Sequence, residues 1–113
     1  ANSYGGWSDV KLKENIVDAN SQWDDIKNLR VRNFNLKEGI TKTQIGLIAQ
    51  EAETVSPGLV FDTPDRDEDG EDLGTTTKSL RYSVLYMKAV KALQEAMAKI
   101  ETLETKVAAL EAA

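Results

Sequence analysis

A long heptad pattern at the end of the chain constrains the fold more than any other feature of the sequence. No Gly or Pro interrupts residues 79–113, so a helix of about 50 Å is allowed at about 1.5 Å per residue. A narrow apolar stripe of this kind is typical of a coiled-coil seam, whereas a helix packed on its own domain, the alternative, shows a wider apolar face. The a positions are Tyr86, Leu93, Ile100 and Val107, and the d positions are Tyr82, Ala89, Ala96, Leu103 and Leu110.

Charged residues beside this seam predict how the helices are oriented. Lys99 and Lys106 fall at g, and Glu104 and Glu111 fall at e. In a parallel coil each Lys faces the Glu five residues further along the partner, whereas an antiparallel coil sets like charges opposite one another. The pattern therefore favours a parallel homo-oligomer. Its size stays open, since β-branched a residues with Leu at d lean toward two strands, but only in the last two heptads.

Composition bounds the rest of the chain. Its 113 residues suit one domain with a modest hydrophobic core. Small domains of this kind often gain stability by forming oligomers. The net charge of -5 argues against a nucleic-acid surface, and no apolar run is long enough to span a membrane. Without Cys or His, the chain lacks disulfides, the usual zinc ligands and the usual general base. We expect no cofactor and no metal, and any catalysis must use Ser, Thr, Lys, Asp, Glu or backbone groups.

The middle of the chain predicts a β-hairpin followed by a short helix. Residues 31–36 alternate in character, and residues 43–49 form the return strand. The apolar run 45–49 within it reads as buried. Residues 50–55 then read as a helical segment stopped by Ser56-Pro57-Gly58, with Glu51 placed against the positive helix start.

Shorter elements are expected on either side of this unit. Alternation near Val10 and Leu12 suggests an extended piece, and a helix capped by Ser21 or Asn20 is expected to begin near Gln22. Further on, the runs 59–61 and 75–77 have strand character and predict a second hairpin.

The tip of that second hairpin is strongly acidic. Residues 65–70 match the first half of a calcium-binding EF-hand loop, with oxygen ligands at alternate positions and a Gly for the turn. The match fails at the twelfth position, where Thr76 replaces the bidentate Glu. A solvated tip is therefore favoured over a calcium-binding adhesion tip formed by Asp65, Asp67 and Asp69. The carboxylates of the loop are Asp62, Asp65, Asp67, Glu68, Asp69, Glu71 and Asp72.

One pair of side chains carries possible chemistry. A serine becomes a good nucleophile only when a base takes its proton, and without His the natural base is a lysine. Ser8 with Lys13 is the favoured pair, and Lys11 is the competing base. If the segment is extended, Lys11 and Lys13 lie on the same side, and each lowers the other's tendency to hold a proton.

Three separated motifs, in order, resemble one known family. The first motif is Ser8-Asp9-x-x-Leu12-Lys13-Glu14-Asn15-Ile16. The second, which follows Phe34, is Gly46-x-Ile48-Ala49-Gln50-Glu51-x-Glu53-x-Val55-x-Pro57. The third is Lys78-Ser79-Leu80-x-Tyr82, and it leads into the coil. The sequence resembles the C-terminal intramolecular chaperone of phage tailspikes and tail fibres, the endosialidase-type auto-processing domain. It is also similar to the auto-cleaving segment of myelin regulatory factors.

The resemblance implies a homotrimer that registers an upstream β-structured stalk of the same chain and then cuts itself off. It implies cleavage of the Trp7-Ser8 bond, with Ser8 as nucleophile and Lys13 as general base. Asn15 and Gln50 are nominated as oxyanion donors, and Asp9 as the residue that orients Lys13 or holds the scissile turn. The implied setting is a virion fibre or spike precursor assembled in the bacterial host cytoplasm, from which the domain is released after cleavage.

Together these patterns predict an α+β fold with small hairpins, short helices and a long C-terminal helix in a parallel trimeric coiled coil. We divide the chain into the end of an upstream fibre segment (1–7), a globular chaperone part (8–78) with an acidic hairpin arm (59–78), and a trimerisation helix (79–113). The principal alternative is a non-cleaving trimerisation cap that stays on the fibre tip.

Overall fold

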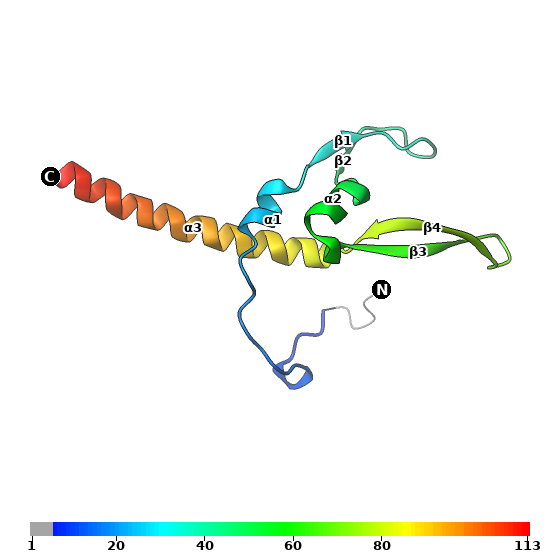
Figure 1. Ribbon diagram of the computed structural model, residues 1–113, viewed down its shortest axis with the longest axis horizontal. Helices are drawn as coiled ribbons and strands as arrows, with labels where there is room; N and C mark the ends of the chain where they lie inside the picture. Colours follow the sequence, from blue (N-terminus) through cyan, green and yellow to red (C-terminus); the bar gives the residue numbers. More distant parts are fainter. Residues whose placement is uncertain (1–5) are drawn as a thin grey trace.

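The computed structural model describes residues 6–113 as a small α+β body from which a long helix and a β-hairpin project in opposite directions (Figure 1). Its principal extents are 73 × 41 × 23 Å, and its radius of gyration of 19.9 Å exceeds the roughly 13 Å of a compact domain of this length. The α+β class is confirmed; residues 1–5 of the predicted lead-in lie outside the described range. The elements are α1 (Trp23–Asn28), β1 (Arg32–Phe34), β2 (Gln44–Gly46), α2 (Ala49–Val55), β3 (Val60–Arg66), β4 (Asp72–Leu80) and α3 (Tyr82–Ala112).

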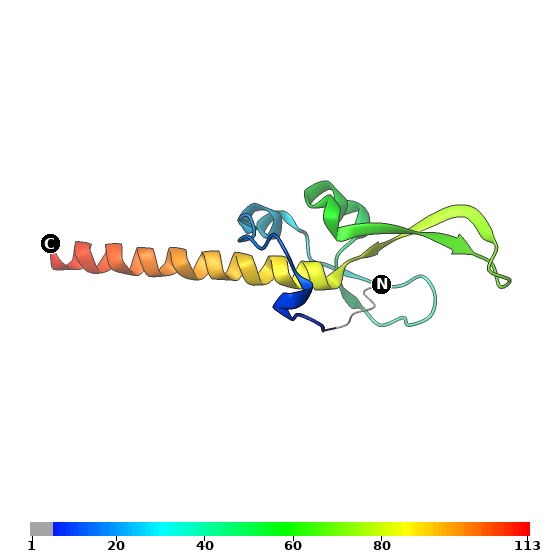
Figure 2. The ribbon, with the colours of Figure 1, turned by 90° about the horizontal axis from the view of Figure 1, so that it is seen from below.

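The long helix α3 begins later than the sequence predicts. Ser79 and Leu80 continue strand β4, where they pair with Phe61 and Val60, so the helix starts at Tyr82 and not at 79. Its 31 residues span about 46 Å at 1.5 Å per residue. Just before it, the Arg81 N–H donates to the Leu59 carbonyl at 2.7 Å. This bond fixes the angle at which the helix leaves the body (Figure 2).

The second hairpin is confirmed and is longer than expected. β3 and β4 pair antiparallel from Val60–Leu80 to Arg66–Asp72, with a register shift between Pro64 and Arg66. β3 extends to Arg66 and β4 begins at Asp72, so both ends of the acidic loop belong to the strands. Only the turn between Arg66 and Asp72 remains as the tip. There the Asp67 carboxylate accepts hydrogen bonds from the backbone N–H groups of Asp69 (2.9 Å) and Glu71 (3.0 Å). Gly70 supplies the positive φ of 83° that closes the turn.

The first hairpin is confirmed, but its second strand is shorter and less buried than predicted. β1 and β2 pair antiparallel with Phe34 opposite Gln44. Gln44 and Gly46 are half-buried, and Ile45 between them is 75% exposed because successive side chains of a strand point to opposite faces. Ala49 is the first residue of α2, so the expected buried strand 45–49 is wrong. The predicted helix and its stop at Ser56 are confirmed.

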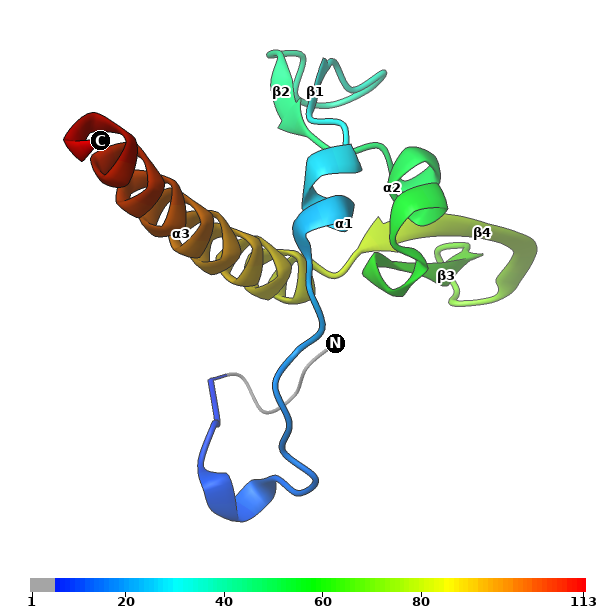
Figure 3. The ribbon, with the colours of Figure 1, turned by 60° about the vertical axis from the view of Figure 1, so that its left-hand side comes forward.

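Within the described residues, the core of one chain is very small. Its buried apolar residues are Ala52, Leu59 and Ala92, and Ser56 is the buried polar one. Ala52 and Leu59 belong to the body around α2. Ala92 is on α3 and lines a pocket together with Trp23 and Ile26 of α1, the helix that packs on α3 (Figure 3). Since burial of apolar area is the main stabilising contribution to folding, one chain alone has little to hold α3 as a helix. No helix within residues 6–113 is apolar enough over a sufficient length to cross a membrane.

Candidate functional site

The predicted nucleophile lies on an exposed segment, residues 6–20, which we call the N-terminal arm. The arm contains a 3-10 turn over Val10–Leu12, so the expected extended piece is wrong. The turn forms because the Asp9 carboxylate accepts a hydrogen bond from the Lys11 N–H at 2.9 Å, a local bond that competes with extended structure. The Leu12 and Lys13 N–H groups then donate to the carbonyls of Asp9 and Val10, each at 3.0 Å.

This turn brings Ser8 and Lys13 together. The Lys13 Nζ donates a hydrogen bond to the Ser8 Oγ at 2.6 Å across the turn. Asp9 caps the turn that lies between the two side chains; within residues 6–113 its carboxylate accepts from the Lys11 N–H and makes no hydrogen bond or ion pair with Lys13. Lys11 does not share this geometry, because the extended backbone that would align it with Lys13 is absent. The Ser8–Lys13 pair has the proximity that proton transfer to an amine requires.

The two nominated oxyanion donors occupy different places. Asn15 has a φ of 53°, a left-handed conformation that Asn tolerates better than most residues, so its position has a conformational explanation. Gln50 lies in the first turn of α2 and lines a groove with Phe34, Lys78 and Tyr82. Figures 1 and 3 place the arm well away from α2, so one chain does not bring Gln50 to Ser8.

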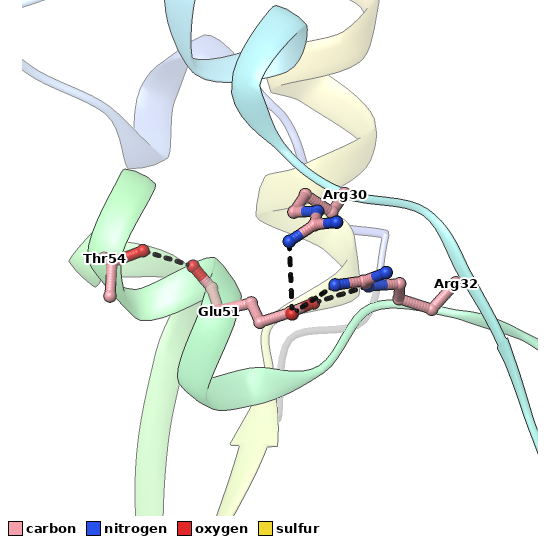
Figure 4. A network of polar contacts seen from close by, with 4 residues as sticks. All are labelled: Arg30, Arg32, Glu51 and Thr54. Carbon is pink, nitrogen blue, oxygen red and sulfur yellow. Dashed lines mark hydrogen bonds and ion pairs between the residues drawn. The ribbon is translucent and has the colours of Figure 1, made fainter.

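Glu51, in the same motif as Gln50, has a structural role. Its carboxylate accepts hydrogen bonds from Arg32 Nε (3.0 Å) and Nη2 (2.7 Å), and Arg30 lies 3.9 Å away (Figure 4). The Arg32 guanidinium lowers the pKa of Glu51 below its usual value. This pairing ties α2 to β1, which agrees with the interpretation of Glu51 as a residue of a strand-to-helix junction.

Two further lysines form ion pairs that the sequence analysis did not identify. Lys78 on β4 bridges Glu53 at 3.1 Å and Asp62 at 3.0 Å, and these carboxylates, Asp62 foremost, raise the pKa of Lys78. Lys88 on α3 pairs with Asp25 at 2.9 Å and lowers the pKa of that carboxyl. Both lysines join elements far apart in the sequence, so no local pattern marks them.

The carboxylates of the second hairpin do not converge on a common point. Asp65 accepts hydrogen bonds from the hydroxyl groups of Thr75 (2.7 Å) and Thr77 (2.6 Å), whereas Asp67 is engaged at the tip. In the part of the chain that the structure describes, no group of three acidic side chains is arranged to hold a metal ion. The calcium-binding tip therefore has no preformed ligand cluster.

The predicted coil seam is largely exposed in the single chain. The large apolar side chains at a and d have half or more of their surface accessible, whereas Ala92, beneath α1, is buried. Burying such a stripe requires another helix, and nothing in residues 6–113 covers its C-terminal half (Figure 1). The exposed seam residues are Tyr82, Tyr86, Leu93, Ile100, Leu103, Val107 and Leu110.

We expect the fold to lose stability in acid. The folded-state pKa values of Asp25, Glu51 and Glu95 are lowered, chiefly by hydrogen bonds from Lys88, Arg32 and Ser21 respectively. The unfolded chain therefore binds protons first, and the stabilisation present above the unfolded values of about 4 is lost as pH falls through the folded values. Melting temperatures measured from pH 7 to pH 3 should decrease. Glu51→Gln should show a smaller decrease, and an equal decrease would contradict the assignment for that residue.

Comparison with known protein families gives a match in the N-terminal part of the chain. Residues 8–61 match the family model described as the chaperone of endosialidase. The resemblance seen in the sequence is thereby confirmed. No curated protein matches the chain. The match contains the Ser8–Lys13 pair and the Gln50-Glu51 motif and ends before the long helix, and it indicates a chaperone role and a peptidase-related domain.

Proposed function

We propose that this chain is an intramolecular chaperone that trimerises a phage tail fibre or tailspike, aligns the three polypeptide chains in register, and then releases itself by autoproteolysis. Cleavage is placed between Trp7 and Ser8. The observation that carries the proposal is the 2.6 Å contact between Lys13 Nζ and Ser8 Oγ, on a segment that matches the endosialidase chaperone family.

The chemistry follows from how Ser8 is connected to the bond that breaks. Lys13, acting as the general base, takes the proton of the Ser8 hydroxyl, and Oγ attacks the Trp7 carbonyl carbon through a five-membered ring. The C–N bond then breaks, the nitrogen takes the proton back from Lys13 to become the amino group of Ser8, and the acyl group is carried on Oγ as an ester. Water opens this ester and leaves a carboxylate on Trp7. The oxyanion formed on the way needs hydrogen-bond donors, for which Asn15 and Gln50 remain our nominations.

The chaperone role follows from the exposed seam of α3. A parallel coil brings three chains together at the same residue, with Lys106 facing Glu111 of the neighbouring helix. An intertwined β-stalk must otherwise close long loops, which is slow and costs chain entropy. A coil formed first removes much of that cost. Removal of the coil afterwards leaves the stalk kinetically trapped, because the path for unwinding is gone.

The proposal is tested by intact and native mass of the chain expressed with its upstream stalk. We expect a trimer whose chains split between Trp7 and Ser8, with the stalk fragment remaining trimeric. A folded trimer of whole chains would refute the cleavage step and favour the non-cleaving cap. A folded monomer or dimer would refute the trimeric chaperone.

A further inference from the structure

The base of the N-terminal arm is attached to α3 by a single carboxylate. The Ser21 hydroxyl donates to Glu95 Oε2 at 2.5 Å, and the Gln22 N–H donates to Glu95 Oε1 at 2.7 Å. Both oxygens are therefore used, and they bind the two residues that directly follow the arm. Together the two bonds fix the point at which the arm leaves the helix.

Lys88 reinforces this attachment from the preceding part of α3. Its Nζ donates to Gln22 Oε1 at 2.5 Å and pairs with Asp25 Oδ2 at 2.9 Å, and its side chain is 15% exposed. One helix turn beyond Glu95, Lys99 lies over the Trp23 ring at 3.7 Å from its centroid. We call Lys88, Glu95 and Lys99 the anchor face of α3.

The anchor face exists only while α3 is helical. Residues 88, 95 and 99 are separated by seven and four positions, a spacing that places them on one side of a helix and scatters them in any other conformation. A helix with an exposed apolar stripe and little cover from its own chain depends on packing against other helices for its stability. Coil assembly and anchoring of the arm are therefore linked.

We propose that Glu95 and Lys88 are positioning residues that couple coil assembly to self-cleavage by anchoring the arm that carries Ser8 and Lys13. The inference rests on the proposed function and adds its regulation. In an unassembled chain α3 has little packing to keep it helical, so the anchor face and the attachment of the arm are weakly held. In the assembled coil the arm is attached to α3 at Ser21 and Gln22. This attachment limits where the Trp7-Ser8 bond can lie relative to the rest of the protein.

The test compares cleavage rates of Glu95→Ala, Glu95→Gln and wild type, each with its native stalk, by timed intact mass. We expect Glu95→Ala to cleave about tenfold or more slowly, because small displacements of a reacting group are costly in rate. Glu95→Gln should stay close to wild type, since its amide oxygen accepts from the Gln22 N–H and its amide nitrogen donates to the Ser21 hydroxyl. Glu101→Ala is the matched control, because the Glu101 side chain is exposed and makes no polar contact within residues 6–113.

Rates are compared per trimer, measured by native mass, together with hydrogen exchange along the chain. We expect faster exchange in residues 8–22 of Glu95→Ala and unchanged exchange in the C-terminal half of α3. The coupling is overturned if Glu95→Ala trimers cleave at the wild-type rate, or if cleavage falls only in proportion to lost trimer. Wild-type trimers that never split would instead refute the proposed function itself, so the two failures are distinguishable.

Discussion

Cleavage at the Trp7-Ser8 bond stops in Ser8→Ala, and it slows by at least about a hundredfold in Lys13→Arg, the loss expected when a general base is removed. Ser8→Ala removes the only oxygen that can reach the Trp7 carbonyl through a five-membered ring. Lys13→Arg keeps a long basic side chain with hydrogen-bond donors at its end. A guanidinium does not lose its proton in proteins, so it cannot accept one from Ser8. Timed intact mass of the chain with its stalk measures both effects.

Lys11→Arg is the matched control for the lysine substitution. Within the described residues Ser8 Oγ accepts its hydrogen bond from Lys13, and Lys11 contributes to the turn through its backbone N–H, which the substitution keeps. We expect wild-type cleavage in this variant. Cleavage that survives Lys13→Arg but fails in Lys11→Arg would transfer the base role to Lys11. Native mass shows that each variant is still assembled, so a loss of cleavage reports on chemistry.

Much of the fold could be predicted because its signals are local. The stop after α2 is marked by Ser56-Pro57-Gly58, and the heptad pattern defines α3 without any knowledge of its neighbours. The errors arise where one side chain or one pairing overrides a pattern. The Asp9 carboxylate turns a short alternating segment into a 3-10 turn. Pairing of Ser79 with Phe61 delays the start of a helix that has no capping side chain of its own.

The candidate site could be predicted only in its local part. Ser8 and Lys13 are five residues apart, a spacing that carries little information by itself, and the resemblance to the endosialidase chaperone family is what singled them out. Glu95 is separated from Ser21 by 74 residues, and its heptad position faces away from the predicted seam, where a carboxylate is normally solvated. Only the packing of α1 on α3 gives this residue a partner. Contacts that depend on tertiary packing leave no periodic trace in a sequence.

Substituting Leu103 with Asp is expected to abolish the trimer at micromolar concentration. Leu103 occupies a d position in the C-terminal half of α3, where its side chain is 58% exposed in one chain and has no cover from the body. Burial of a leucine contributes about 1.5–3 kcal/mol, and a trimer loses this three times over. Three carboxylates brought together in one apolar layer add desolvation and mutual repulsion. The expected loss is therefore about 5 kcal/mol or more per trimer.

Ala98→Asp is the control for this substitution, because it introduces the same charge on the opposite side of the same helix. Its cost should be limited to the difference in helix propensity, less than about 1 kcal/mol. Native mass and far-UV circular dichroism measure assembly and helix content. We expect Leu103→Asp to lose both signals together, since α3 has too little cover from its own chain to stay helical. A helical monomer would show that α3 folds alone, and an intact trimer would show that the seam lies elsewhere on the helix.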